Sequence, residues 1–283
     1  MWCCLVGSEM CIRDRVLSEF GAFFYPVRKY NFPLKMLSSE WPIGINYEAG
    51  VSAQIKSAVI LAGLNSFGNT NIIETEKSRD HTENMLLNNK ESIKIKRGKR
   101  KHIKIFGKKF IDSLKIDVPG ETSSYAFFSA LTILNEKSSI IIKNVGLNPT
   151  RIGFYKLLKK HGANIKFKYF KNKNNEPRGD IFVTSCKLKS LKASKEYYVN
   201  STDEYPILFV IAALTKGLSI FKGIKDLANK ESNRIKEMQK ILKQIGVQST
   251  ATKNQLKIFG KGMINARNKM IIVPNLGDHR ICM

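Results

Sequence analysis

Three stretches of the chain share one order of apolar and polar segments. Each begins with small polar residues, continues as an apolar helix and a strand, and then adds a polar turn, a second helix and a strand or strand pair. The stretches start near Ser52, Ser124 and Asp203, so successive starts are 124 − 52 = 72 and 203 − 124 = 79 residues apart. A repeat on this scale predicts subdomains built to one plan.

The same pattern predicts the elements of each unit. The helices are strongly apolar, so we expect them to lie inside, covered by sheets, in an α/β or α+β architecture. Small polar residues suit the helix starts, because their side chains accept hydrogen bonds from backbone N–H groups that lack a partner. The expected helices are 55–64, 125–134, 152–162, 205–217 and 235–246, with one opening at 78–82, and the expected strands are 71–74, a pair within 93–110, 139–145, 164–170, 218–224 and 255–260.

Composition narrows the class of protein. A chain of 283 residues that is 43% hydrophobic can bury a core in one or two domains and is too apolar to be disordered. Its longest apolar run, Tyr205–Leu214, is half of the roughly 20 residues that a membrane-spanning helix needs. We therefore expect no membrane association, and the sparse cysteines fit the reducing cytoplasm.

The net charge of +25 indicates an anionic partner or a highly solvated surface. Because the lysines are spread along the chain, we interpret most of this charge as surface. The densest run, 90–109, holds ten Lys and Arg residues. These alternate with isoleucines, which favours a strand with one solvated face, although a basic nucleic-acid-binding module is an alternative.

Basic residues recur at matching points of the repeat. Arg79, Arg151 and Arg234 stand where the second helices begin, and helix starts attract anions. Lys230 is four residues before Arg234, so we expect both on one helix face, and Glu231 is placed to orient the Arg234 guanidinium. The pattern predicts a cleft for a multiply anionic ligand, and the alternative is ordinary capping with surface ion pairs.

Asp203 precedes a very apolar helix and has two open interpretations, as a helix cap or as a catalytic carboxylate. The four histidines and five cysteines show no metal-ligand spacing, and the chain has no Walker loop, GxGxxG or HExxH motif. We therefore expect neither a metal nor a nucleotide cofactor.

The two ends differ from the rest. Residues 1–15 hold three of the five cysteines and show no periodicity, so we interpret them as a non-native leader. The chain stops at Met283, three residues after the polar cluster Asp278-His279-Arg280, which we place in a loop or at a helix start. We interpret the chain as a fragment that lacks both ends.

These residues together resemble the 5-enolpyruvylshikimate-3-phosphate synthase family in its bacterial form. The resemblance implies two domains of repeated βαβαββ units, incomplete here, with 16–118 as the C-terminal part of the first domain and 119–283 as most of the second. The matching segments, in the family's order, are SAQIKSAVILAGL, SRDHTENML, VPGETSSYAFF, NVGLNPTRIGFYKLLKKHGANI, DEYPILFVIAAL, NKESNRI and GDHRICM.

The resemblance also implies a reaction. The family transfers the enolpyruvyl group of phosphoenolpyruvate to the 5-hydroxyl of shikimate 3-phosphate in chorismate and aromatic amino acid biosynthesis, and it uses no metal or organic cofactor. Such an enzyme is expected to be a cytoplasmic monomer. The related UDP-N-acetylglucosamine enolpyruvyl transferase is an alternative, but the segments around Arg234 and Arg280 fit the shikimate enzyme better.

The resemblance assigns roles to single residues. Asp203 accepts a proton, and Glu231 is a second proton-transfer residue. Asp278 and His279 position Arg280, whereas Arg151 is structural. Several N-terminal and C-terminal ligand segments of the family are absent, so we expect this chain alone to have little or no activity. Shikimate 3-phosphate is assigned to Ser52, Ala53, Gln54, Arg79, Asp203 and Lys230, and phosphoenolpyruvate to Gln54, Arg234 and Arg280.

Overall fold

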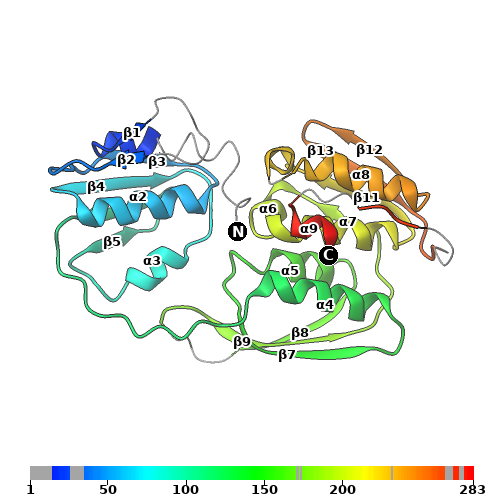
Figure 1. Ribbon diagram of the computed structural model, residues 1–283. Helices are drawn as coiled ribbons and strands as arrows, with labels where there is room; N and C mark the ends of the chain where they lie inside the picture. Colours follow the sequence, from blue (N-terminus) through cyan, green and yellow to red (C-terminus); the bar gives the residue numbers. More distant parts are fainter. Residues whose placement is uncertain are drawn as a thin grey trace. The chain divides into compact units, whose positions relative to one another are not determined.

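The chain forms two compact units (Figure 1). Unit 1 comprises Met1–Asp117 with Asn174–Glu176, and unit 2 comprises Val118–Lys173 with Pro177–Met283. The boundary falls beside residue 118, where the sequence was divided; the match of these units to family domains stays a prediction, and most of the expected leader lies outside the described residues. The computed structural model describes residues 15–25, 35–169, 172, 174–230, 232–264, 270–273 and 277–283.

Unit 1 is built on a four-stranded sheet of order β3-β4-β6-β5, in which only the β3–β4 pair is parallel. The long helix α2 connects these two parallel strands and packs on the sheet. A short helix at 15–19 and a two-stranded sheet complete the described part. The elements are β1 Phe23–Tyr25, β2 Lys35–Leu37, β3 Asn46–Ala49, α2 Ala53–Asn65, β4 Asn69–Glu74, α3 His81–Leu86, β5 Ile93–Lys96 and β6 Lys101–Phe106.

The basic run 90–109 forms the antiparallel pair β5–β6, as its alternation predicted. Ile103 and Ile105 of β6 are buried, whereas Lys104 between them is exposed. The strand pattern with a solvated basic face is thus confirmed.

Unit 2 contains two sheets, of orders β7-β9-β8 and β10-β11-β13-β12. The apolar helix α7 packs against β13, α4 and α8, so it lies at the centre of the core (Figure 1). The elements are α4 Thr122–Leu134, β7 Ser139–Gly146, α5 Gly153–Lys160, β8 Asn164–Tyr169, β9 Arg178–Thr184, β10 Lys192–Ala193, α6 Lys195–Val199, the 3-10 turns η1 Thr202–Glu204 and η2 Lys225–Asn229, α7 Tyr205–Ala213, β11 Gly217–Lys222, α8 Arg234–Gln244, β12 Gln248–Thr252, β13 Gln255–Gly260 and α9 His279–Cys282.

The expected burial of the apolar helices holds for α7, where Leu208 and Phe209 have no exposed surface. It is wrong for one side of α2 and of α4. Leu61 of α2 is 49% exposed, and Phe128 and Leu131 of α4 are 54% and 62% exposed. Among the described residues, α2 and α4 each pack against their sheet on one side and leave another side exposed. Their sequences are apolar on all sides, so they do not show which side is exposed.

A buried group of four charges ties the elements of unit 1 together. The Lys56 ammonium on α2 is fully buried and donates to Glu74 at 2.8 Å, and it lies 2.7 Å from Glu83 of α3. Lys101 of β6 lies 3.0 Å from the same Glu83 oxygen. Burial raises the pKa of Glu74, but the hydrogen bonds from Lys56 and Ser78 outweigh it, and the net pKa is lower than usual.

Replacing Lys56 with methionine is expected to destabilise unit 1 by about 3–5 kcal/mol, because two buried carboxylates lose the fully buried cation between them and keep only Lys101. Urea unfolding measures the change. The matched control is Lys99→Met in the exposed β5–β6 turn, where a change within about 0.5 kcal/mol is expected. Equal, small effects of the two substitutions would show that the buried group contributes nothing to stability.

Candidate functional site

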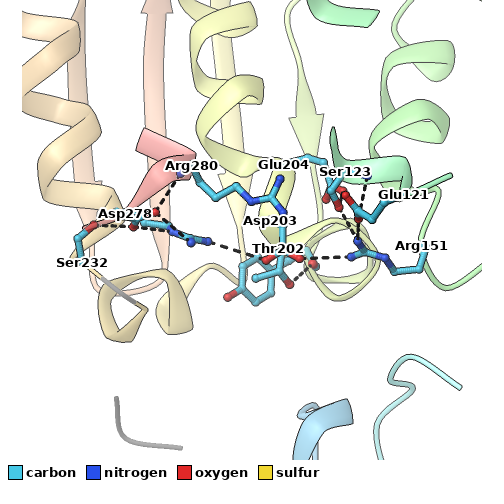
Figure 2. A network of polar contacts seen from close by, with 11 residues as sticks. Glu121, Ser123, Arg151, Thr202, Asp203, Glu204, Ser232, Asp278 and Arg280 are labelled. Carbon is cyan, nitrogen blue, oxygen red and sulfur yellow. Dashed lines mark hydrogen bonds and ion pairs between the residues drawn. The ribbon is translucent and has the colours of Figure 1, made fainter. Parts of the chain in front are cut away.

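Five side chains of alternating charge lie in a row in unit 2, and each is supplied by a different segment. Figure 2 shows Asp278, Asp203, Arg151 and Glu121 of this row joined by dashed polar contacts. The charge array, as we call these residues, is Glu121, Arg151, Asp203, Arg234 and Asp278.

One end of the charge array is the buried pair of Arg234 and Asp278. Arg234 is the first residue of α8, and its Nε and Nη2 donate to the two Asp278 oxygens at 2.9 and 3.2 Å. Asp278 also accepts from Ser232 Oγ at 2.8 Å and from the Arg280 backbone N–H at 3.2 Å. Burial raises the pKa of Asp278, but these bonds, led by that from Arg234, bring it below its usual value.

This geometry adds Arg234 to the residues that Asp278 is expected to position. Its carboxylate holds the Arg234 guanidinium side-on, and it meets Arg280 through the backbone, as the N-cap of α9. Asp278 therefore orients the Arg234 guanidinium as well as the backbone at the start of α9, where Arg280 lies. Arg280 lies in the first turn of α9, so the helix start that we allowed for at this cluster is present.

The other end of the charge array is held by the start of α4. Arg151 is 9% exposed, and its Nη2 donates to Glu121 Oε1 at 2.6 Å and to Ser123 Oγ. Glu121 is the N-cap of α4 and accepts from the backbone N–H groups of Ser123 and Ser124. The expected helix start at those serines is wrong, because the helix begins at Thr122 and the Glu121 side chain reaches forward to the N–H groups of the serines.

Asp203 lies in the middle of the charge array, in the 3-10 turn η1 that leads into α7. Its Oδ2 is 3.4 Å from Arg151 Nη1, and its Oδ1 is 4.0 Å from Arg234 Nη1. The N-cap position of α7 is Glu204, so the interpretation of Asp203 as that cap is wrong. With a side chain 26% exposed, Asp203 is a partly accessible carboxylate between two arginines.

The predicted ligand residues of unit 1 gather on two neighbouring segments. Ser52 is the N-cap of α2, where it makes no capping hydrogen bond with its side chain, and Ala53 and Gln54 follow in the first turn. Arg79 lies in the turn before α3. Glu74 accepts hydrogen bonds from both the N–H and the hydroxyl of Ser78, so the residue next to Arg79 is held by the buried charge group.

Two expectations near α8 have different outcomes. Lys230 ends η2 in an extended conformation, and α8 begins only at Arg234 with Asn233 as its N-cap. The expectation that Lys230 and Arg234 share a helix face is therefore wrong, because the helix starts later than the sequence suggested. Glu231, the second proton-transfer candidate, lies outside the described residues.

The sequence missed the link between Arg151 and Asp203, because the family resemblance gave Arg151 only a structural role. Glu121 was missed entirely, because glutamate is not among the residues that favour the N-cap position and its sequence context gave no signal. Among the described residues, no group of three or more His, Cys, Asp or Glu side chains is arranged to hold a metal ion.

Comparisons with known proteins agree on one family. A family model described as EPSP synthase (3-phosphoshikimate 1-carboxyvinyltransferase) matches residues 16–283. A 3-phosphoshikimate 1-carboxyvinyltransferase of Bacillus pumilus is 39% identical over 241 residues, covering 85% of this chain and 55% of the relative. One from Petrotoga mobilis is 36% identical over 275 residues, covering 94% and 61%. The chain thus spans less than two thirds of the length of these relatives.

Solved structures show the same fold. An EPSP synthase of Acinetobacter baumannii matches with a TM-score of 0.77 and 32% identity, over 95% of this chain and 61% of that one. The enolpyruvyl transferase NikO of Streptomyces tendae matches with a TM-score of 0.63 at 12% identity, over 88% of this chain and 57% of that one, which shows the fold alone. The predicted α/β enolpyruvyl transferase fold is confirmed.

The Glu121 carboxylate gives the charge array a dependence on pH. Burial raises its pKa, but hydrogen bonds from Ser123 and Ser124 and the charge of Arg151 lower it from 4.5 to about 2. A lowered pKa stabilises the fold above 4.5, and this contribution is lost as pH falls from 4.5 towards 2.

We therefore expect Glu121→Gln to lower the free energy of unfolding at neutral pH, with a difference from the wild type that shrinks between pH 4.5 and about 2. Urea titrations over that pH range measure it. The control is Glu48→Gln, whose side chain is 68% exposed. A constant difference across the range would contradict the assigned cause.

Proposed function

The chain belongs to the EPSP synthase (3-phosphoshikimate 1-carboxyvinyltransferase) family, since the family model matches residues 16–283, and on this premise we propose that it serves the family's reaction. The enolpyruvyl group of phosphoenolpyruvate is transferred to the 5-hydroxyl of shikimate 3-phosphate, and phosphate is released. This is a transferase step in aromatic amino acid biosynthesis. The charge array of unit 2 is the observation that carries the proposal.

In the proposed mechanism the charge array supplies both anion binding and proton transfer. Arg234, held side-on by Asp278, and Arg280 at the start of α9 bind the phosphoenolpyruvate anion. Asp203 accepts the proton of the 5-hydroxyl while the hydroxyl oxygen bonds to C2 of phosphoenolpyruvate. At the same time Glu231 donates a proton to C3 of phosphoenolpyruvate. The C–O bond to phosphate then breaks, and C3 returns a proton as the double bond re-forms.

Unit 1 is proposed to hold shikimate 3-phosphate. The start of α2 offers backbone N–H groups and a positive helix dipole, to which Ser52 and Gln54 add side-chain donors. Arg79 supplies a positive charge next to Ser78, which Glu74 holds in place. Lys230 and Asp203 of unit 2 are proposed to bind the same substrate, Ala53 to line its site, and Gln54 to contact phosphoenolpyruvate as well.

The remaining features of the proposal follow from the family. We propose that the protein works in the cytoplasm as a monomer, without a metal or an organic cofactor. Along the described part of the chain, no helix has the length and apolar character needed to cross a membrane. The sister activity on UDP-N-acetylglucosamine is not favoured, because the curated relatives described above are all shikimate enzymes.

The nucleic-acid alternative is not favoured either. The run that suggested it forms the β5–β6 pair, whose isoleucines are part of the core of unit 1. Apart from Lys101, which pairs with Glu83, its lysines are exposed to solvent.

Binding of phosphoenolpyruvate tests the proposal directly. Arg280→Gln is expected to weaken binding about tenfold to a hundredfold, because a charged hydrogen bond contributes about 1.5–3 kcal/mol. Isothermal titration calorimetry in the presence of shikimate 3-phosphate measures it. The control is Arg100→Gln in unit 1, where the arginine side chain is 61% exposed and binding should not change. A wild-type chain that binds neither substrate would refute the proposal.

Turnover tests the expectation that this chain alone has little or no activity. Phosphate release from the two substrates is measured for the 283-residue chain and for the full-length Bacillus pumilus relative. We expect the chain to be slower by several orders of magnitude, because family ligand segments are absent from its sequence. Comparable rates would contradict the interpretation of the chain as a fragment.

A further inference from the structure

We propose that Arg151 is a positioning residue for Asp203, whose carboxylate it holds in one orientation through a guanidinium anchored on the start of α4. This assigns to Arg151 a role in proton transfer rather than in the fold alone. The inference rests on the proposed function, in which Asp203 accepts the substrate proton. It concerns the contact between two side chains, so it can be tested without any substrate.

Hydrogen bonds hold both the side chain and the backbone of Arg151 in place. Its Nη2 donates to Glu121 Oε1 and Ser123 Oγ, and Glu121 is itself held by the backbone of α4. Its backbone N–H donates to the Asn148 carbonyl at 2.8 Å. The Asn148 side chain accepts from the N–H and the hydroxyl of Thr150, which closes the turn before α5.

The orientation of this anchored guanidinium makes it specific for Asp203. The guanidinium group is planar and rigid, so hydrogen bonds that fix one of its nitrogens also fix the direction in which the other nitrogens point. With Nη2 on Glu121 and Ser123, Nη1 faces Asp203 Oδ2 at 3.4 Å. Arg234 approaches the other carboxylate oxygen at 4.0 Å, beyond hydrogen-bond distance. Among these two arginines, Arg151 is therefore the one that makes a directional bond to the carboxylate.

The charges around Asp203 set the sign of the expected effect. Arg151 faces it from the turn before α5 and Arg234 from α8, whereas Glu204 on η1, Glu121 at α4 and the Tyr198 hydroxyl on α6 are the acidic groups nearby. Tyr205 of α7 is a further titratable neighbour along the chain, and Asp278 lies behind Arg234. Removing Arg151 leaves three carboxylates with one fewer cation, which makes protonation of Asp203 easier.

The test follows the carboxyl ¹³C resonance of Asp203 against pH in the full chain with ¹³C-labelled aspartate, where Asp203→Asn identifies the signal. In Arg151→Gln the titration midpoint is expected to move to higher pH. Arg151→Lys retains the charge without the fork, so its midpoint should lie between those of the Gln variant and the wild type. The control is Ile181→Val, which removes a buried methylene from unit 2 and no charge; its midpoint should match the wild type.

A second comparison covers the case in which Arg151→Gln does not fold. The pair Glu121→Gln with Arg151→Gln removes one charge of each sign, and its midpoint should lie above that of Glu121→Gln alone. An Asp203 midpoint unchanged by loss of Arg151 in both comparisons would overturn the positioning role. That result would leave the enzyme assignment standing, since phosphoenolpyruvate binding and turnover test it separately.

Discussion

The geometry of unit 2 depends on two buried guanidiniums whose charges must be compensated. A buried cation is costly unless carboxylates surround it, so Arg151 and Arg234 each require acidic partners at fixed places. Arg234 is 1% exposed and is bonded to Asp278, which has no exposed side-chain surface. Glu121 meets the same need for Arg151. Asp203 then lies where the two cations meet, and this places a partly exposed carboxylate beside positive charge.

Unit 1 also compensates a buried cation with carboxylates. There the buried Lys56 ammonium lies between two carboxylates, and Lys101 completes the group. The result is again that a helix start and a turn are held together, here the start of α2 and the turn that carries Arg79. In both units, charge compensation in the interior fixes helix starts, and helix starts are where anionic ligands bind most readily.

This arrangement suits the proposed reaction, in which both substrates are anionic. Cations at the surface would attract such ligands but would move with them, whereas guanidiniums fixed by carboxylates that are themselves hydrogen-bonded keep their orientation. The same charge compensation holds Arg151 in a fixed position next to Asp203, the proposed proton acceptor. The exposed lysines that give the chain its net charge of +25 contribute little to this geometry.

The sequence by itself determined the family and the positions of most helices and strands. It also showed that an arginine recurs near the start of the second helix in each of the three repeated stretches. These follow from local periodicity and from segments that are contiguous in the chain. It did not reveal β9, which lies between β7 and β8, because a single strand was assigned after the second helix of that stretch although β9 carries the apolar run 181–183. It also did not reveal β12, which is polar and mostly exposed and has no apolar run.

Only the tertiary structure decided which charges meet. Arg151 and Asp203 are 52 residues apart, and Arg234 and Asp278 are 44 apart. Ion pairing depends on distance and burial in three dimensions, and no spacing rule along the chain encodes either.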